Sequence, residues 1–267
     1  MANLENLISV VMQEGYNQAN AEARVCQDIV LKAIAESAFS DHITVKGGVV
    51  MRSITGDARR ATQDMDLDFI RYSLEDVSIQ RFIDRLNCLD GIKLSITAPI
   101  EALSQQEYRG KRVYILIEDD TGHSLRSKID LGVHTQAQIE QEKYCFDVCL
   151  DDEGASLLIN SPEQIFTEKL RSLLRFGPLS TRYKDIFDLC YLSDQIQLDR
   201  LNRCIDTYIL SDPNMREQSV DDILNRVHRT FNDRTYLQRL ERSRSANWMD
   251  IKPTDAMSKI ESFLKSI

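Results

Sequence analysis

Apolar residues recur along this chain with two different periods, and the changes of period divide it into regions. Helical spacing near the N-terminus gives way to strand-like alternation in the middle, and helical spacing returns after residue 155. Helices are predicted over 4–14, 20–38, 74–89 and 164–176, and strands from Ile43 and over 92–100, 112–118, 125–133 and 144–150. A turn is expected at 151–154. The pattern predicts an α/β domain with a mixed sheet over 1–154, followed by a helical domain over 155–267.

Composition excludes several classes of protein. Hydrophobic residues make up 42% and charged residues 28% of the 267 residues, as in ordinary globular proteins. No apolar run approaches the roughly 20 residues of a membrane helix, and the N-terminus lacks a signal sequence, so we expect a cytoplasmic protein without a membrane partner. The six cysteines form no CxxC pair or metal spacing. Lysine and arginine number 33 against 42 acids, a net charge of −9, which argues against a protein coated in nucleic acid but allows a local basic groove.

A glycine pair interrupts the first strand at Lys46-Gly47-Gly48. The pattern there is a strand, a glycine turn and then the apolar start of a helix. Glycine adopts backbone angles closed to other residues and lets a ligand approach the main chain, while the amides at a helix start attract anions. A lone glycine pair is usually only a turn, so the prediction of a phosphate site depends on the next strand of the chain.

That next strand carries acids on alternate residues. Asp64, Asp66 and Asp68 share one face, because side chains alternate along a strand. Such a row is either a solvated edge that discourages aggregation or a site for a divalent cation. Oxygen ligands suit Mg²⁺ or Mn²⁺ better than zinc. The spacing alone allows either Asp64 with Asp66 or Asp66 with Asp68 as the metal pair.

Asp130 is a further acid between apolar neighbours of a strand that should be central. An isolated buried carboxylate is unfavourable. Asp130 is therefore expected either to cap a turn near Gly132, to pair with Lys128 or Arg126, or to complete a metal site with the first pair, and the third hypothesis is favoured.

The helical region carries charged residues at recognisable positions. Ser161 is the expected N-cap of a helix with Pro162 at its first position, and Lys169 is expected at the border of that helix's apolar face, exposed rather than buried. Asp185 and Asp188, three residues apart, share a face of the next helix. Taken alone, Lys169 is a solvated lysine and Asp185 an acid favoured by the helix dipole.

Taken together, these motifs resemble the AbiEii family of bacterial nucleotidyltransferase toxins, which belongs to the DNA polymerase β-like superfamily, occurs in type IV toxin-antitoxin and phage-defence systems, and is related to the MenT toxins. The resemblance spans roughly 28–192. It consists of KGG, an arginine followed by Thr-x-Asp-hydrophobic-Asp (RATQDMD), the strand aspartate, PEQIFTEK and TRYKDIFD, in that order. The family's metal pair follows Thr62 by two residues, which selects Asp64 and Asp66. At the position of Val49 the family more commonly has a threonine.

The resemblance implies a role for each matching residue. Asp64 and Asp66 would hold Mg²⁺ or Mn²⁺, Asp130 would complete the metal face, and Asp185 would carry the fourth motif. The nucleoside triphosphate would be bound by Lys46, Gly47, Gly48, Ser53, Thr62, Lys169, Arg182 and Lys184. The implied activity is nucleotide transfer to a cellular acceptor, with the 3′ end of a tRNA as the leading candidate and a cognate antitoxin as partner. The alternatives are an enzyme that modifies a small molecule and an inactive binding protein.

A basic run lies beyond these motifs. Between residues 226 and 244 six arginines face two acids, Asp233 and Glu241, a local charge of +4. The arginines are Arg226, Arg229, Arg234, Arg239, Arg242 and Arg244. Either they form a solvated helix face or they bind an RNA backbone.

Overall fold

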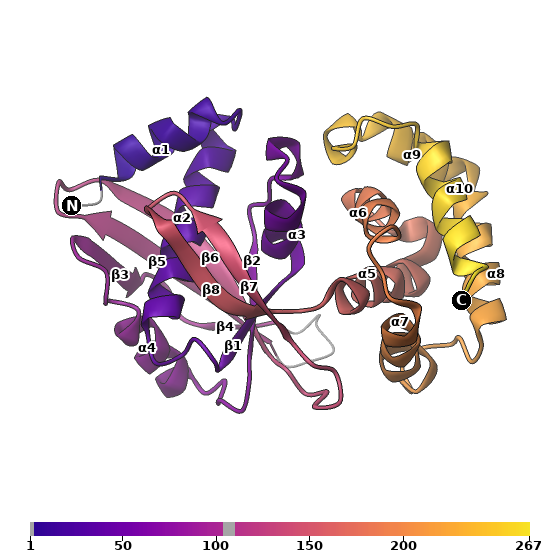
Figure 1. Ribbon diagram of the computed structural model, residues 1–267, viewed down its shortest axis with the longest axis horizontal. Coiled ribbons are helices and arrows are strands. Elements are labelled where there is room, and N and C mark those ends of the chain that lie inside the picture. Colours follow the sequence, from indigo (N-terminus) through magenta and orange to yellow (C-terminus); the bar gives the residue numbers. More distant parts are fainter. Residues whose placement is uncertain (1–2, 104–109) are drawn as a thin grey trace. The chain divides into compact units, whose positions relative to one another are not determined.

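The computed structural model describes residues 3–103 and 110–267. The chain forms two compact units, an N-terminal unit of residues 1–160 and a helical unit of residues 161–267. The N-terminal unit combines a mixed sheet with helices, and the other contains only helices within its described residues (Figure 1). The predicted fold class is confirmed.

The sheet places the acidic strand at its centre. Its strands, within the described residues, are β1 (Ile43–Lys46), β2 (Met65–Phe69), β3 (Ile92–Ile96), β4 (Glu101–Leu103), β5 (Gly110–Asp119), β6 (Ser124–Val133), β7 (Glu142–Val148) and β8 (Asp151–Ile159). Their order is β3-β5-β6-β2-β1-β8-β7, with β4 paired to β5. β2 runs antiparallel to β1 and parallel to β6. The acids of β2 therefore have a hydrogen-bonded strand on either side, so the solvated-edge hypothesis is wrong.

Helices cover the apolar side of β2. The described helices of this unit are α1 (Leu4–Gln13), α2 (Gln18–Glu36), α3 (Gly47–Thr55), the short 3₁₀ helix η1 (Ala58–Arg60) and α4 (Asp76–Arg85). Met65, Leu67 and Phe69 alternate with the acids and are at most 1% exposed. Phe69 meets Phe82 of α4 edge-on at 5.2 Å between ring centroids. Burial of this face decides which side of β2 is left for the acids.

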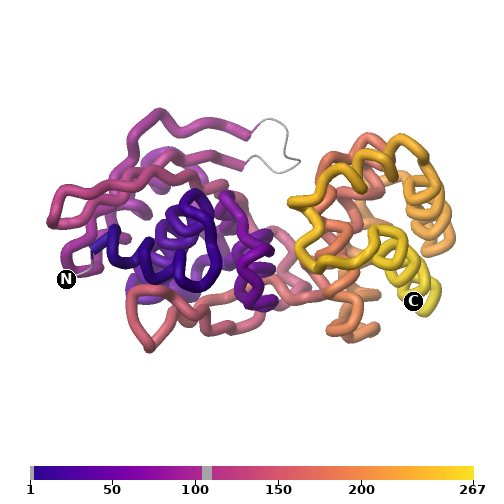
Figure 2. The backbone as a smooth tube through the Cα atoms, turned by 90° about the horizontal axis from the view of Figure 1, so that it is seen from above, coloured from indigo at the N-terminus to yellow at the C-terminus, as the bar shows by residue number. Residues whose placement is uncertain are grey.

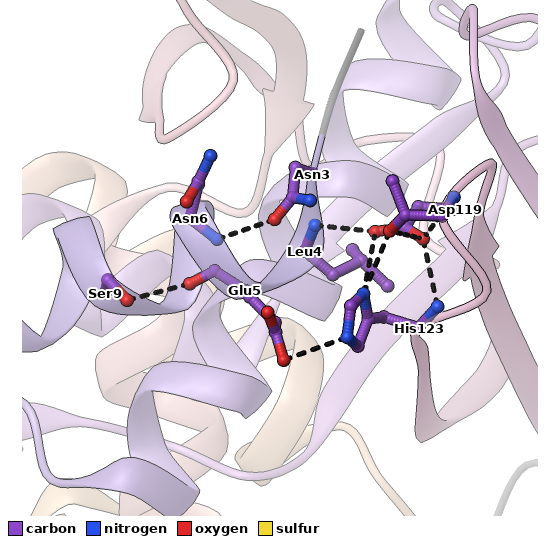
Figure 3. A network of polar contacts seen from close by, with 8 residues as sticks. Asn3, Leu4, Glu5, Asn6, Ser9, Asp119 and His123 are labelled. Carbon is purple, nitrogen blue, oxygen red and sulfur yellow. Dashed lines mark hydrogen bonds and ion pairs between the residues drawn. The ribbon is translucent and has the colours of Figure 1, made fainter.

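Asp119 ties the N-terminus to the turn between β5 and β6 (Figure 3). The backbone N–H of Leu4 donates to its Oδ2 at 2.9 Å, and the Thr121 hydroxyl and the His123 N–H donate to its Oδ1 at 2.6 and 3.0 Å. Burial alone would raise the pKa of Asp119, but these hydrogen bonds favour the charged form and lower the pKa to about 2. A charged carboxylate therefore anchors α1.

The predicted turn at 151–154 is wrong, because these residues begin strand β8. Gly154 lies inside the strand at φ +74°, and a Cβ there would come within 2.7 Å of the Phe146 carbonyl oxygen of β7. Beyond it, Ala155, Leu157 and Ile159 alternate as buried residues. The boundary between the two compact units falls between Asn160 and Ser161, whereas the sequence placed it after residue 154. Pairing with β1 and β7 makes residue 154 part of strand β8, which continues to Ile159.

The helical unit is built around α5. Its described elements are α5 (Pro162–Phe176), η2 (Gly177–Leu179), α6 (Lys184–Leu192), α7 (Leu198–Ile205), the π-helical turn η3 (Asp206–Leu210), α8 (Val220–Phe231), α9 (Arg234–Arg242), η4 (Arg244–Ala246) and α10 (Pro253–Leu264), coloured from salmon through orange to yellow in Figure 2. Ser161 is the N-cap of α5, since its hydroxyl accepts the Gln164 N–H at 3.2 Å. Among the residues described in the two units, none of the helices is both long and apolar enough to cross a membrane.

Candidate active site

The register of the sheet brings Asp66 and Asp130 side by side. Asp66 lies opposite Lys46 of β1 and opposite Asp130 of β6, and Asp130 lies opposite Arg112 of β5. Residues opposite one another on paired strands point to the same face of the sheet. A row of Lys46, Asp66, Asp130 and Arg112 therefore crosses the sheet, with two adjacent carboxylates between two cations.

Each of three acids has a basic partner. Arg112 holds both oxygens of Asp130, with Nε and Nη2 each 2.7 Å from a different carboxylate oxygen. The ammonium of Lys128 lies 2.7 Å from Asp64, and that of Lys46 lies 2.6 Å from Asp68. The hypotheses that Asp130 caps a turn or pairs with Lys128 or Arg126 are replaced by a bidentate pair with Arg112.

Asp66 has a perturbed pKa. Burial raises it most, and repulsion by Asp130, Asp64 and Asp68 adds to this, while Lys46 acts in the opposite direction; the pKa is about 6. Among residues 3–103 and 110–267, no three histidine, cysteine or acidic side chains are grouped as a ready metal centre. The carboxylates of Asp64, Asp66 and Asp130 nonetheless fit a hard cation, because such cations prefer oxygen ligands. Burial and the neighbouring acids together also disfavour the charge of Asp66 more than Lys46 compensates for it.

Exposure distinguishes Asp64 from Asp68. The Asp64 side chain is 56% exposed, whereas that of Asp68 is 10% exposed and paired with Lys46. A Cβ at Gly132 would collide with the Asp68 carboxylate, so that glycine makes room for Asp68. An incoming ligand therefore has access to Asp64 rather than to Asp68.

Glycine is required at both positions of the pair by contacts with the acidic segment. Gly47 has φ +66°, and a Cβ there would lie 2.5 Å from an Asp66 oxygen. A Cβ on Gly48 would lie 2.5 Å from the Thr62 hydroxyl. The glycine turn, Thr62 and Asp66 are thus in direct contact, and the amides at the start of α3 lie beside the acids.

A buried ion pair connects α3 to α2. Asp28 of α2 is fully buried, and its carboxylate accepts bonds from Arg52 of α3 at 2.8 Å and from the Cys149 backbone N–H at 3.1 Å. Val49, in place of the threonine common in the family, is fully buried. Ser53 lies in the second turn of α3 and is half-buried, and its contact with the phosphates stays a prediction.

In the helical unit, Lys169 is the centre of a second charged cluster. Its ammonium lies 2.6 Å from Asp185 and 2.8 Å from Asp188. Asp188 is fully buried and also accepts a hydrogen bond from Trp248 Nε1 at 3.0 Å. The expectation of an exposed Lys169 is wrong, because its side chain is only 11% exposed. Arg182 is exposed and Lys184 half-buried at the start of α6.

The six arginines of the basic run divide into two groups. Arg226 donates from Nε to the Leu174 carbonyl at 3.2 Å, and Arg239 donates to the Pro178 carbonyl. Arg226 therefore stabilises the end of α5 and Arg239 stabilises η2, and both are half-buried. The exposed arginines are Arg229, Arg234, Arg242 and Arg244.

Several residues of these clusters were not predicted from sequence. Arg112, Asp28 and Trp248 lie 18, 24 and 60 residues from the partners to which they bond. No local pattern connects residues at such separations. The only available signal for Trp248 was that it is the single tryptophan of the chain, and a buried indole usually finds an acceptor for its N–H.

Three comparisons with known proteins bear on the chain, and the family model is the one that identifies the family. No curated protein sequence matches the chain. Among solved structures it is similar to an antigenic nucleotidyltransferase-like protein from Paracoccidioides brasiliensis, at 14% identity over 82% of this chain and 92% of that one, with a TM-score of 0.47. The family model for the nucleotidyl transferase AbiEii toxin of type IV toxin-antitoxin systems matches residues 29–251, a span that includes both charged clusters. The chain therefore belongs to the AbiEii nucleotidyltransferase toxin family.

Proposed function

We propose that this nucleotidyltransferase transfers a nucleotide from a nucleoside triphosphate to RNA, with the 3′ end of a tRNA as acceptor, and that Asp64 and Asp66 hold a divalent cation for the reaction. The observation that supports this best is the contact of the glycine turn with Asp66. It places an anion-attracting helix start directly beside the adjacent carboxylates of Asp66 and Asp130.

Asp64 and Asp66 are the proposed ligands, with Asp130 beside them as the third acid. Mg²⁺ or Mn²⁺ at this place would neutralise phosphate charge that the acids alone repel. Arg112 fixes the orientation of Asp130 through both carboxylate oxygens. We infer that Asp130, held in this orientation, orients the acceptor hydroxyl.

The proposed reaction is an in-line displacement. The acceptor hydroxyl oxygen forms a bond to the α-phosphorus, the bond from that phosphorus to the bridging oxygen breaks, pyrophosphate leaves and the hydroxyl proton is lost to solvent. Gly47, Gly48 and Lys46 supply the phosphate site through main-chain amides and one ammonium, and Thr62 borders it. Lys169, Asp185, Arg182 and Lys184 carry the later family motifs, and their contacts with the nucleotide remain predictions.

The activity is tested by incubating the protein with each labelled nucleoside triphosphate, Mg²⁺ and total cellular RNA. Label should enter RNA of tRNA size, and the variant Asp64→Asn with Asp66→Asn should incorporate none. Label found only in small molecules would support the alternative acceptor. Label in tRNA at an equal rate with the double variant would show that the metal site is wrongly assigned.

The exposed arginines provide a separate test of the RNA acceptor. Each arginine that contacts a phosphate contributes about one unit to the log–log slope of affinity against salt. Changing Arg229, Arg234 and Arg242 to Gln should flatten that slope for tRNA and leave nucleotide binding unchanged. Unaltered affinity and slope would identify these residues as a solvated helix face.

Membership of a type IV toxin-antitoxin family also implies an antitoxin partner. Expression of the chain alone should arrest growth, and co-expression of the neighbouring antitoxin should relieve the arrest. The double variant Asp64→Asn with Asp66→Asn should be harmless in both situations, which separates toxicity by nucleotide transfer from toxicity by overproduction.

A further inference from the structure

The end of α5 exposes an apolar pair. Phe176 is the last residue of α5 and is 49% exposed, and Leu179 of η2 is 77% exposed. The large apolar side chains that are exposed in the described residues are Val10, Met12, Val77, Phe176, Leu179 and Leu198, and Phe176 is the one aromatic ring among them. A single exposed apolar residue is ordinary, but an exposed aromatic ring three residues before an exposed leucine is a surface suited to a ligand.

Backbone geometry at Gly177 sustains this arrangement. Gly177 has φ +52°, and a Cβ there would lie 2.8 Å from a terminal nitrogen of Arg226. Where α5 ends, the Leu174 carbonyl of α5 accepts a bond from Arg226 of α8, and the Pro178 carbonyl of η2 accepts a bond from Arg239 of α9. These two bonds lie before and after Phe176 in the chain, and the second also precedes Leu179 directly.

The surroundings of the apolar pair are basic. The Arg175 guanidinium carbon lies 5.8 Å from the centroid of the Phe176 ring, within the range of a cation–π contact. Residues 175–182 contain two arginines and no acid, and Arg226 and Arg239 approach the same segment from other helices. Arginine has five donors in a fork, so the single bonds of Arg226 to a carbonyl leave donors for a phosphate.

We propose that Phe176 and Leu179 form a stacking platform for an unpaired base of the RNA acceptor, with the surrounding arginines binding the flanking phosphates. This inference rests on the proposed function and specifies that its acceptor is recognised through a single-stranded nucleotide. Unstacked RNA bases bind exposed aromatic rings next to positive charge. The charge complementarity of Arg175, Arg226 and Arg239 with a polyanion favours RNA as the occupant.

The test measures binding of a labelled uridine oligomer of about eight nucleotides to the full chain and to three variants. Loss of one stacking contact should weaken affinity about 5- to 150-fold, so Phe176→Ala should bind that much less tightly. Phe176→Trp should keep the affinity, and its fluorescence should be quenched by the oligomer, because the only native tryptophan, Trp248, is 4% exposed. Val77→Ala, at an apolar site of the other unit that is 61% exposed, should bind as the wild type does.

Each other outcome has a defined meaning. Unchanged affinity of Phe176→Ala, or no quenching in Phe176→Trp, overturns the platform while transfer to RNA by the wild type preserves the proposed function. If the wild-type protein neither binds nor labels RNA, both fail. Normal RNA binding by Phe176→Ala with loss of the antitoxin complex would show that the patch is a protein-binding surface, which also overturns the platform. Urea unfolding of each variant verifies that the fold is retained.

Discussion

The two units each contain a cluster of charged side chains, and the clusters differ in how well their charges are balanced. In the N-terminal unit, Asp64 is largely exposed and Asp66 has a raised pKa beside Asp130. In the helical unit, Lys169 lies between Asp185 and the fully buried Asp188, and Trp248 satisfies the remaining oxygen of Asp188. The acids of the N-terminal cluster therefore still repel one another. In the helical cluster, Lys169 and Trp248 provide partners for the acids.

The difference separates groups available to a ligand from groups that maintain the fold. Carboxylates that repel one another are relieved by an incoming cation, so their replacement should affect activity more than stability. Buried charges that are fully paired behave in the opposite way, because removing one partner leaves the other uncompensated. Three predictions test this contrast through the free energy of unfolding, and one on Asp119 adds a buried carboxylate outside both clusters; they run from the largest change to the smallest.

Lys169→Ala should lower the free energy of unfolding by about 3–5 kcal/mol, the typical result of breaking a buried ion pair from one side. The physical reason is that Asp188, which is fully buried, loses its ammonium partner. Urea unfolding followed by circular dichroism measures the change, with Lys265→Ala, an exposed lysine of the same unit, as the control. A loss no greater than in the control would mean that the cluster does not stabilise the helical unit.

Trp248→Phe should lower the free energy of unfolding by about 1–3 kcal/mol, because the fully buried Asp188 loses the hydrogen bond from Trp248 Nε1. Phenylalanine keeps an aromatic ring beside Tyr191, whose ring meets that of Trp248 at 5.5 Å. The same urea measurement applies, and Tyr191→Leu in both backgrounds separates ring packing from the hydrogen bond. A stability equal to that of the wild type would show that the N–H of Trp248 is not needed.

Asp119→Asn should give a smaller loss, since the amide keeps one acceptor oxygen, and the loss should depend on pH. The pKa of Asp119 is lowered from 3.8 to about 2 in the folded chain. Its contribution is therefore fully present above pH 3.8 and disappears as pH falls toward 2. Urea unfolding of both proteins from pH 6 downward should show a difference that shrinks across this window, and a constant difference would contradict the prediction.

Asp64→Asn with Asp66→Asn should change stability least, within about 0.5 kcal/mol in the absence of added metal. Relief of repulsion at Asp66 offsets the lost pairing of Asp64 with Lys128, which is an exposed contact. Isothermal calorimetry with Mg²⁺ or Mn²⁺ should detect binding by the wild type only. A large destabilisation would assign these acids to the fold instead.

The local sequence pattern was sufficient to predict elements whose apolar residues recur regularly and motifs that lie within one segment of the chain. The alternation through Met65, Leu67 and Phe69 predicted both the strand and the common face of the acids, and the Ser161-Pro162 start of α5 was predicted from capping chemistry. Strand β8 was missed because Gly154 and the preceding acids are typical of a turn. Only pairing with β1 and β7 makes that segment a strand.

By itself the sequence determined the fold class, the family and the adjacency of a glycine turn to alternating acids, because these depend on residues close together in the chain. The tertiary structure alone decided which charges meet. It paired Asp130 with Arg112, turned Lys169 inward onto Asp188 and placed Trp248 on that same acid. Ion pairs of this kind depend on strand register and helix packing between distant residues, and no local propensity encodes either of these.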